Sequence, residues 1–419
     1  MNSVFRTCLS VIGFAAIVSA QQHYKITDLK PLPGGNFSQA FSVNNIGLIG
    51  GQSNITDATQ RAVIWVKGWS SPILLGTPAG VNSATYGINE NGLAEVQSEL
   101  AETDPNSENF CGYGTDLNCL PFAWQNNTLT QLPLLGGNNG AVGGINNRGE
   151  ISGWAESATI DPDCAAPQKL DFEAVVWKIR ASAGWGTKPI EMRRLRPLSG
   201  DTVSMSIWIN DRGEAVGTSG SCADTGLLPL GHGAHAVLWD ENGSPLNIGD
   251  FDPNHEFGGI ALSINNKSQV VGGTNQPGGS FLPFLWSRHA GVRMLGLLPG
   301  GAGGGAVSIN DRGDAVGQSF DADGVPSPVL WQEGKGPQNL NDLAPHSPLY
   351  LLWPTTINAQ GEISGFGVTP DGDIHGFLAT PHNAKPDEDG CAADGDIRPS
   401  VLSEHLRSLM RRRFEAHRR

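Results

Sequence analysis

The sequence predicts an all-β protein, a seven-bladed β-propeller made of four-stranded blades. Three observations lead to this prediction: abundant turn residues, a motif that recurs seven times, and matching strands at the two ends of the repeat region. Gly (56 residues) and Pro (27 residues) make up about a fifth of the 419 residues, which indicates many turns between short strands. A hydrophobic fraction of 39% can build a core and argues against intrinsic disorder.

The recurring motif is an apolar residue, Asn, two further residues, Gly, three residues and a second Gly. Ile309-Asn310-Asp311-Arg312-Gly313 with Gly317 shows it in full, whereas Val96 replaces the second Gly in one copy and Ser268 the first Gly in another. Repeats of this spacing are typical of propeller blades and solenoids. The seven Asn residues are Asn44, Asn89, Asn146, Asn210, Asn265, Asn310 and Asn358.

Two further anchors accompany each Asn. An apolar segment ends in Trp, as in Ala236-Val237-Leu238-Trp239, although Ala379 takes the Trp place in the seventh unit. A leucine-rich segment that ends in Pro or Gly, such as Leu297-Leu298-Pro299-Gly300, precedes the next Asn. Three linked anchors in seven copies indicate one structural unit repeated along the chain.

Each unit is predicted to form four strands. The first strand, rich in small residues, ends at the Asn, whose side chain closes a turn while the Gly supplies a positive φ. The second strand contains the second Gly, the third ends at the Trp, and the fourth is placed on the leucine-rich segment, for example at residues 294–298. Four strands in about 45 residues is the size of a propeller blade.

The seventh unit lacks a fourth strand of its own, because its third strand ends near Ala379. Residues 24–29 match a fourth strand and run into Pro31-Leu32-Pro33-Gly34. The N-terminal strand is therefore predicted to complete the last blade and close the ring, which removes exposed sheet edges. An open β-solenoid is the alternative.

The anchors resemble the HAF repeat of extracellular, mainly bacterial proteins, which is named for His-Ala-Phe in the third strand. The closest forms are His235-Ala236-Val237 and His375-Gly376-Phe377, and the likeness covers about residues 24–380. The resemblance implies export and a repeat fold, and it brings no catalytic residues. Because the other five units lack the His, we do not expect it to be a shared catalytic group.

The chain ends differ from the repeat region. Residues 1–20 read as a signal peptide, with Arg6, a short apolar run and a small-residue cleavage site at Val18-Ser19-Ala20. We therefore expect a secreted protein, extracellular, periplasmic or on the cell surface, and the absence of an apolar run of about 18 residues predicts no transmembrane span. Residues 381–397 read as an acidic linker. Residues 398–419 form a basic tail, and both a helix and a frayed segment are consistent with its sequence.

Three units carry inserts between their second and third strands, at residues 97–119, 155–172 and 219–234. These inserts are expected to lie side by side on one face, and export permits disulfides. We predict one bridge inside the first insert and a second between the other two. The cysteines concerned are Cys111, Cys119, Cys164 and Cys222, while the state of Cys391 stays open.

No catalytic, cofactor or metal site is predicted. The sequence lacks a nucleophile elbow, a zincin motif and a phosphate loop, and the Gly-rich residues 301–306 fall in a predicted strand. The acidic segments at 321–324 and 371–373 lack the remaining ligands of a calcium loop. Residues weighed and left without a role are Asp161, Asp163, Asp252, Glu256, His232 and His235.

The function predicted is a binding module that uses inter-blade and inserted loops on one face. Its ligand, a glycan, a peptide or an envelope protein, is not identified by the sequence, and a monomer is expected. The net charge of −14 argues against nucleic acid, because phosphates would be repelled. An extracellular polysaccharide hydrolase or lyase and a structural or adhesive surface protein are the alternatives.

Overall fold

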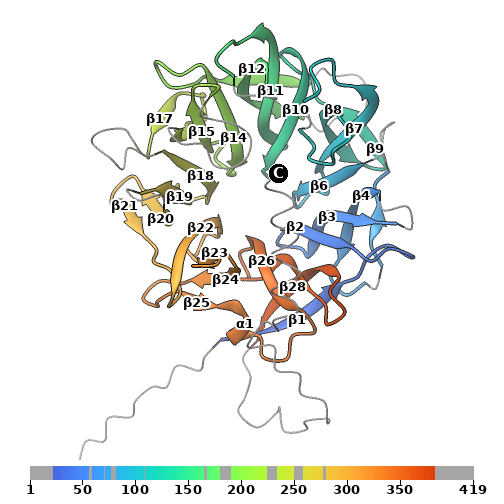
Figure 1. Ribbon diagram of the computed structural model, residues 1–419, viewed down its shortest axis with the longest axis vertical. Helices are drawn as coiled ribbons and strands as arrows, with labels where there is room; N and C mark the ends of the chain where they lie inside the picture. Colours follow the sequence, from blue (N-terminus) through green and yellow to red (C-terminus); the bar gives the residue numbers. More distant parts are fainter. Residues whose placement is uncertain are drawn as a thin grey trace, which may run out of the picture.

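The computed structural model describes residues 22–382 apart from 56–58, 70, 77–81, 109, 165–167, 180–189, 224–233, 250–257 and 277–279. The chain forms seven four-stranded antiparallel sheets that stand as blades around a common axis (Figure 1). This is the seven-bladed β-propeller predicted from the sequence, and the β-solenoid alternative is wrong. The predicted signal peptide, Cys391 and the basic tail lie outside the described residues.

Blades 1 to 6 use their strands in chain order, and the first strands of neighbouring blades contact one another around the axis. Blade 1 contains β2 (Ser38–Val43), β3 (Leu48–Asn54), β4 (Gln60–Val66) and β5 (Ile73–Leu74). Blade 2 contains β6 (Ser83–Ile88), β7 (Ala94–Thr103), β8 (Leu117–Gln125) and β9 (Thr128–Gln131). Blade 3 contains β10 (Gly136–Ile145), β11 (Glu150–Ile160), β12 (Leu170–Lys178) and β13 (Glu191–Leu195). Blade 4 contains β14 (Val203–Ile209), β15 (Ala215–Gly220), β16 (His235–Trp239) and β17 (Pro245–Asn247).

Blade 5 contains β18 (Gly259–Ile264), β19 (Val270–Asn275), β20 (Phe281–Ser287) and β21 (Gly291–Met294). Blade 6 contains β22 (Gly301–Ile309), β23 (Ala315–Asp321), β24 (Pro326–Trp331) and β25 (Gln338–Asn339). Blade 7 contains β26 (Tyr350–Ile357), β27 (Ile363–Val368), β28 (Ile374–His382) and, on its outer edge, β1 (His23–Leu29). In the described part of the chain a single helix, α1 (Leu340–Leu343), precedes β26, and no described helix has the length and hydropathy to cross a membrane.

The ring closes through its first strand, as predicted. β1 pairs antiparallel with β28 along its whole length, from His23 opposite His382 to Leu29 opposite Gly376. Tyr24 and Ile26 are buried in the core of blade 7. The N-terminal strand therefore contributes both hydrogen bonds and apolar contacts to the last blade.

In the six blades that have it, the second Gly of the motif lies beside a β-bulge. In every blade the register of the first strand shifts at the residue three before the repeat Asn. Beside this bulge the backbone of the first strand approaches the second strand so closely that a Cβ at Gly217 would collide with the carbonyl oxygen of Met205. The same collision would occur in blades 1, 3, 5, 6 and 7, so backbone packing, and not turn formation, selects this Gly.

The repeat Trp residues join each blade to the one before it. Trp65, Trp177, Trp239 and Trp331 are buried in clusters that contain residues of the preceding blade. Each indole N–H donates to a carbonyl of the connecting segment, at 2.8–3.1 Å. The Trp thus fills the space between blades, as expected from the sequence.

The placement of the fourth strand on the leucine-rich segment is corrected by the structure. β21 ends at Met294, and Leu295 and Leu298 lie in the connection to blade 6, packed against the cluster that contains Trp331. Leucine is used there because the connection crosses the gap between two blades and must bury side chains in it.

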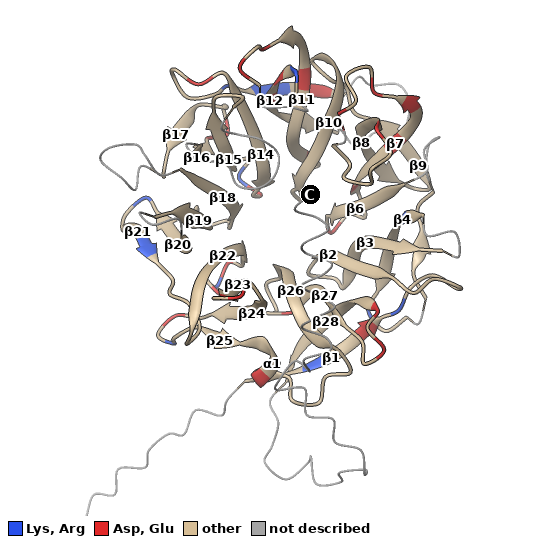
Figure 2. Ribbon diagram, in the orientation of Figure 1, with Lys and Arg blue, Asp and Glu red and all other residues tan. Residues whose placement is uncertain are grey.

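The ring has two faces. The turn face carries the Asn-x-x-Gly turns and the turns between third and fourth strands. The loop face carries the loops between second and third strands together with the connections between blades. Most of the strand ribbon is free of charged residues (Figure 2).

Candidate functional site

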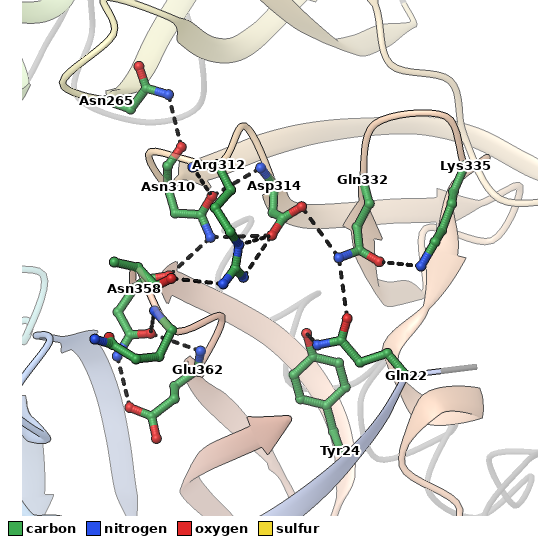
Figure 3. A network of polar contacts seen from close by, with 12 residues as sticks. Gln22, Tyr24, Asn265, Asn310, Arg312, Asp314, Gln332, Lys335, Asn358 and Glu362 are labelled. Atoms are coloured by element: carbon green, nitrogen blue, oxygen red, sulfur yellow. Dashed lines mark hydrogen bonds and ion pairs between the residues drawn. The ribbon is translucent and has the colours of Figure 1, made fainter. Parts of the chain in front are cut away.

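The seven repeat Asn residues form a closed ring of hydrogen bonds around the axis on the turn face. Each side-chain Nδ2 donates to the backbone carbonyl of the Asn in the next blade, at 2.8–3.1 Å. The bond from Asn358 to Asn44 closes the ring, and Figure 3 shows the links through Asn265, Asn310 and Asn358. Each Oδ1 also accepts from the N–H groups two and four residues later.

A second layer of polar contacts surrounds this ring at the mouth of a funnel of about 170 Å³. The N–H of Asn147 donates to Oδ1 of Asp211 at 2.7 Å, and the N–H of Asp211 donates to Oδ1 of Asn266 at 2.8 Å. Arg312 pairs with Asp314 at 2.8 Å and donates to the Ala359 carbonyl of the next blade (Figure 3). These oxygens already accept hydrogen bonds from the protein itself. The polar contacts of the turn face are therefore best explained by a structural role, in which they hold neighbouring blades together.

The first strands of the seven blades surround the axis, and each contains a bulged residue three positions before the repeat Asn. The bulged residues of the seven first strands are Phe41, Tyr86, Gly143, Ile207, Leu262, Val307 and Thr355. The rings of Phe41 and Tyr86 stack with their centroids 4.9 Å apart.

Glu95 is buried between blades 2 and 3. Its side chain is fully buried, and neither carboxyl oxygen has a hydrogen-bond partner. Burial raises the pKa of Glu95 well above the usual value, because the charged form loses its hydration. No other blade has a carboxyl group at this position; the equivalent residues are Gly50, Ser152, Val216, Val271, Val316 and Ser364.

The inserts of blades 2, 3 and 4 lie on the loop face, and they extend the second and third strands of blades 2 and 3. β7 and β11 have 10 and 11 residues, whereas β15 and β19 have 6. The structure contains both expected disulfides: Cys111–Cys119 closes the insert of blade 2, and Cys164–Cys222 links blade 3 to blade 4. The described residues of 100–117, 157–169 and 220–223 are called the insert surface below.

A small core beneath the insert surface holds the three inserts together. Trp154 and Phe172 of blade 3 pack with Phe110 of blade 2 and with Val203 and Cys222 of blade 4. The rings of Phe110 and Trp154 meet edge to face at 5.2 Å. Apolar contacts therefore span three consecutive blades at this face.

A buried carboxylate network also joins the inserts of blades 2 and 3. The Asn139 amide donates to Asp104 at 2.8 Å and to Glu156 at 3.2 Å, and Glu108 accepts from the Lys169 N–H at 2.8 Å. Burial, together with the nearby Glu108 charge, raises the pKa of Glu156 to about 7. Burial also raises the pKa of Glu108, and the nearby charge of Asp104 raises it further.

Other residues weighed in the sequence are placed as follows. Asp161 accepts from the N–H of Asp163 at 2.8 Å and lies beside the sulfurs of Cys164 and Cys222. Those sulfurs are bonded to each other, so the group is no metal site. Among the described residues no other close group of three potential ligand side chains occurs. His232, Asp252 and Glu256 lie outside the described residues.

The histidines that carry the resemblance to the HAF repeat each pair with an aspartate. His235 Nδ1 lies 3.1 Å from Asp201, and His375 Nδ1 lies 2.9 Å from Asp28. Neither aspartate was singled out in the sequence, because each lies outside the repeat anchors. The same holds for Asn139, Glu108 and Glu156, whose proximity depends on the packing of separate blades.

Compared with protein-family models and with curated proteins, the sequence matches none. Solved structures match it in fold. A prolyl endopeptidase aligns with a TM-score of 0.52 and 8% identity over 84% of this chain and 51% of that chain. The acylaminoacyl peptidase of Pyrococcus horikoshii gives 0.49 and 12%, over 85% and 54%. The β-propeller domain of the trilobed protease from Pyrococcus furiosus gives 0.37 and 10%, over 73% and 98%.

The chain spans about half the length of the prolyl endopeptidase that it resembles. At 8% identity the likeness shows the propeller fold alone. The fold and the site together define a seven-bladed β-propeller with disulfide-linked inserts on one face. What those inserts do has to be argued from their own chemistry.

Proposed function

We propose that this protein is an exported binding module that holds a cationic peptide segment on the insert surface. The observation that carries the proposal is that inserts from three consecutive blades are fixed to one another. A disulfide, a shared apolar core and a carboxylate network join them. A surface ordered before binding loses less conformational entropy when a partner arrives, and loops on a rigid scaffold are where propellers carry function.

The class of partner follows from the exposed groups. Glu102, Asp116 and Asp163 are exposed on the insert surface, and the ribbon around β7 and β11 carries several acidic positions (Figure 2). Ile160, on the same insert surface, is 74% exposed. Acidic groups around an exposed aliphatic side chain favour a basic peptide with an apolar residue over a phosphorylated or sulfated partner.

Export is part of the proposal. It is supported by the two disulfides, which form and persist in oxidising compartments, and by the composition of residues 1–20. Membership of the HAF-repeat family is proposed on the same footing. His235 and His375 support it, since both occupy the His position of that repeat at the start of the third strand.

The test is a solid-phase array of basic, neutral and acidic peptides, probed with the disulfide-bonded protein and followed by calorimetry on the best peptide. We expect basic peptides to bind, with affinity that falls as salt is added. The double variant Glu102→Lys/Asp163→Lys is expected to weaken binding about tenfold or more, because it reverses two charges at the surface.

The matched control is Glu241→Lys/Glu333→Lys, which makes the same charge change at exposed positions on the turn face. It is expected to leave binding within about twofold. Equal loss in both double variants, or a preference for acidic peptides, contradicts the proposal. Glycan arrays and polysaccharide digestion assays run in parallel, and turnover of any polymer would replace the binding module by the hydrolase or lyase alternative.

A further inference from the structure

A cavity of about 500 Å³ opens on the loop face where the ring closes, away from the insert surface. It is called the closure cavity here. Three separate segments line it: residues 28–36 at and after the end of β1, residues 348–349 before β26, and residues 369–375 between β27 and β28. The cavity exists only because the first strand of the chain completes the last blade.

One wall holds an oriented histidine. His375 Nδ1 lies 2.9 Å from Oδ1 of Asp28, and both side chains are largely buried, at 15% and 21% exposed. The carboxylate fixes the imidazole ring and its tautomer, with the proton on Nδ1. Nε2 is then the ring nitrogen left to accept a hydrogen bond from a hydroxyl group.

The opposite wall supplies further acceptors that are already positioned. Asn36 donates to Oδ1 of Asp373 at 3.2 Å and is itself held by Asn54 at 3.0 Å. The Asp373 N–H donates to Thr369 Oγ1 at 3.1 Å. These bonds join the segment after β1 to the loop between β27 and β28, so the cavity needs little rearrangement to receive a ligand.

The remaining lining is apolar or charged. Pro31, Pro348, Pro370 and Leu349 supply flat aliphatic surface. The charged lining residues are mostly acidic: Asp28, Asp371 and Asp373. Apart from His375, Lys30 is the only basic residue in the lining. Acidic side chains therefore outnumber basic ones in the cavity, which disfavours an anionic ligand.

We propose that the closure cavity binds a saccharide unit without negative charge, a neutral or an amino sugar. Carboxylate and imidazole acceptors suit adjacent hydroxyl groups, and the proline rings suit the C–H face of a pyranose. A few convergent polar groups on an otherwise aliphatic wall are typical of small-molecule sites. This site is separate from the insert surface and does not depend on the peptide proposed there.

The test uses saturation-transfer NMR and calorimetry on the full chain with glucose, N-acetylglucosamine, glucosamine and glucuronate. We expect transfer to at least one of the first three and the weakest response for glucuronate. His375→Gln and Asp371→Asn are each expected to weaken binding about fivefold or more. The matched control is His235→Gln, which removes the other paired histidine but does not line the cavity.

Thermal melts of each variant show whether the blade still forms. If His375→Gln unfolds, Asp371→Asn, which changes an exposed side chain, decides the question. Transfer to none of the four sugars, a preference for glucuronate, or equal loss with His235→Gln would overturn the proposal. Peptide binding at the insert surface, measured on the same samples, separates failure of this site from failure of the proposed function.

Discussion

The two faces of the ring are built by opposite rules. On the turn face every blade makes the same contacts, with one Asn that closes its own turn and bonds to the next blade. On the loop face the seven blades differ in loop length, cysteine content and charge. In this protein, residues repeated in every blade stabilise the fold. Residues that occur in a single blade either lower the stability of the fold or serve a function.

The largest expected effect is at a repeated residue. Asn210 donates to the Asn265 carbonyl and to Glu214 and accepts from two backbone N–H groups. Asn210→Ala removes all four bonds and leaves buried groups unpaired, so we expect a loss of about 3 kcal/mol in the free energy of unfolding. Urea unfolding followed by tryptophan fluorescence measures it.

The matched control for this change is Asn242→Ala, because Asn242 is exposed in a turn of the same face. A loss of about 0.5 kcal/mol or less is expected there. If the two variants lose the same amount, the Asn ring is not a source of stability and the contrast between the faces fails.

A smaller effect of opposite sign is expected at Glu95, which has no counterpart in the other blades. Glu95→Val introduces the residue found at this place in blades 4, 5 and 6 and removes a buried carboxyl group without hydrogen-bond partners. We expect a gain of about 2 kcal/mol in stability. The reciprocal change Val216→Glu is expected to destabilise by a similar amount, and a loss of stability in Glu95→Val contradicts this assignment.

The gain at Glu95 is expected to depend on pH. The pKa of Glu95 is raised in the folded state, so the folded protein keeps a proton that the unfolded chain releases. Stability of the wild type therefore falls as pH rises above the usual pKa of Glu. The difference between Glu95→Val and the wild type is expected to grow as the pH rises above the usual pKa of Glu.

The smallest effect is expected in the carboxylate network of the loop face. The pKa of Glu156 is about 7 in the folded protein and 4.5 in its ordinary state, so the stability that its proton supports is present at low pH and lost as pH rises through 7. Glu156→Gln keeps the shape and removes the titration. We expect it to flatten the decline in melting temperature between about pH 5 and about pH 8, an effect of roughly 1 kcal/mol.

A control for the pH effect is Glu102→Gln, since Glu102 is exposed on the same insert surface. It is expected to leave the pH profile unchanged. An unaltered profile in Glu156→Gln would mean that protonation of the network does not hold the inserts of blades 2 and 3 together.

Local sequence patterns predicted much of the fold. The Asn and the first Gly of each motif encode a turn within five residues, and even Ser268 adopts the positive φ of that Gly, at 57°. Closure by residues 24–29 followed from the missing fourth strand of the last unit. The disulfide partners followed from the placement of the inserts on adjacent blades.

The remaining features depend on distances that no local pattern encodes. The bonds from each Asn side chain to the carbonyl of the next repeat Asn join residues 45 to 64 positions apart, except where the ring closes. Asn139 meets Asp104 and Glu156 only after two blades have packed. The closure cavity is assembled from three segments that span most of the chain, so its residues looked like ordinary loop residues in the sequence.

The pairing of β1 with β28 has a consequence for how the molecule can assemble with itself. If β1 detaches, β28 becomes an open edge lined by unpaired backbone groups, and an identical first strand from a second copy offers it the same register, from His23 opposite His382 onward. Strand exchange between copies is thus a route by which this ring would form linked pairs or chains under partly denaturing conditions. Tyr24 and Ile26 of one copy would then fill the core that the first strand of its neighbour has left.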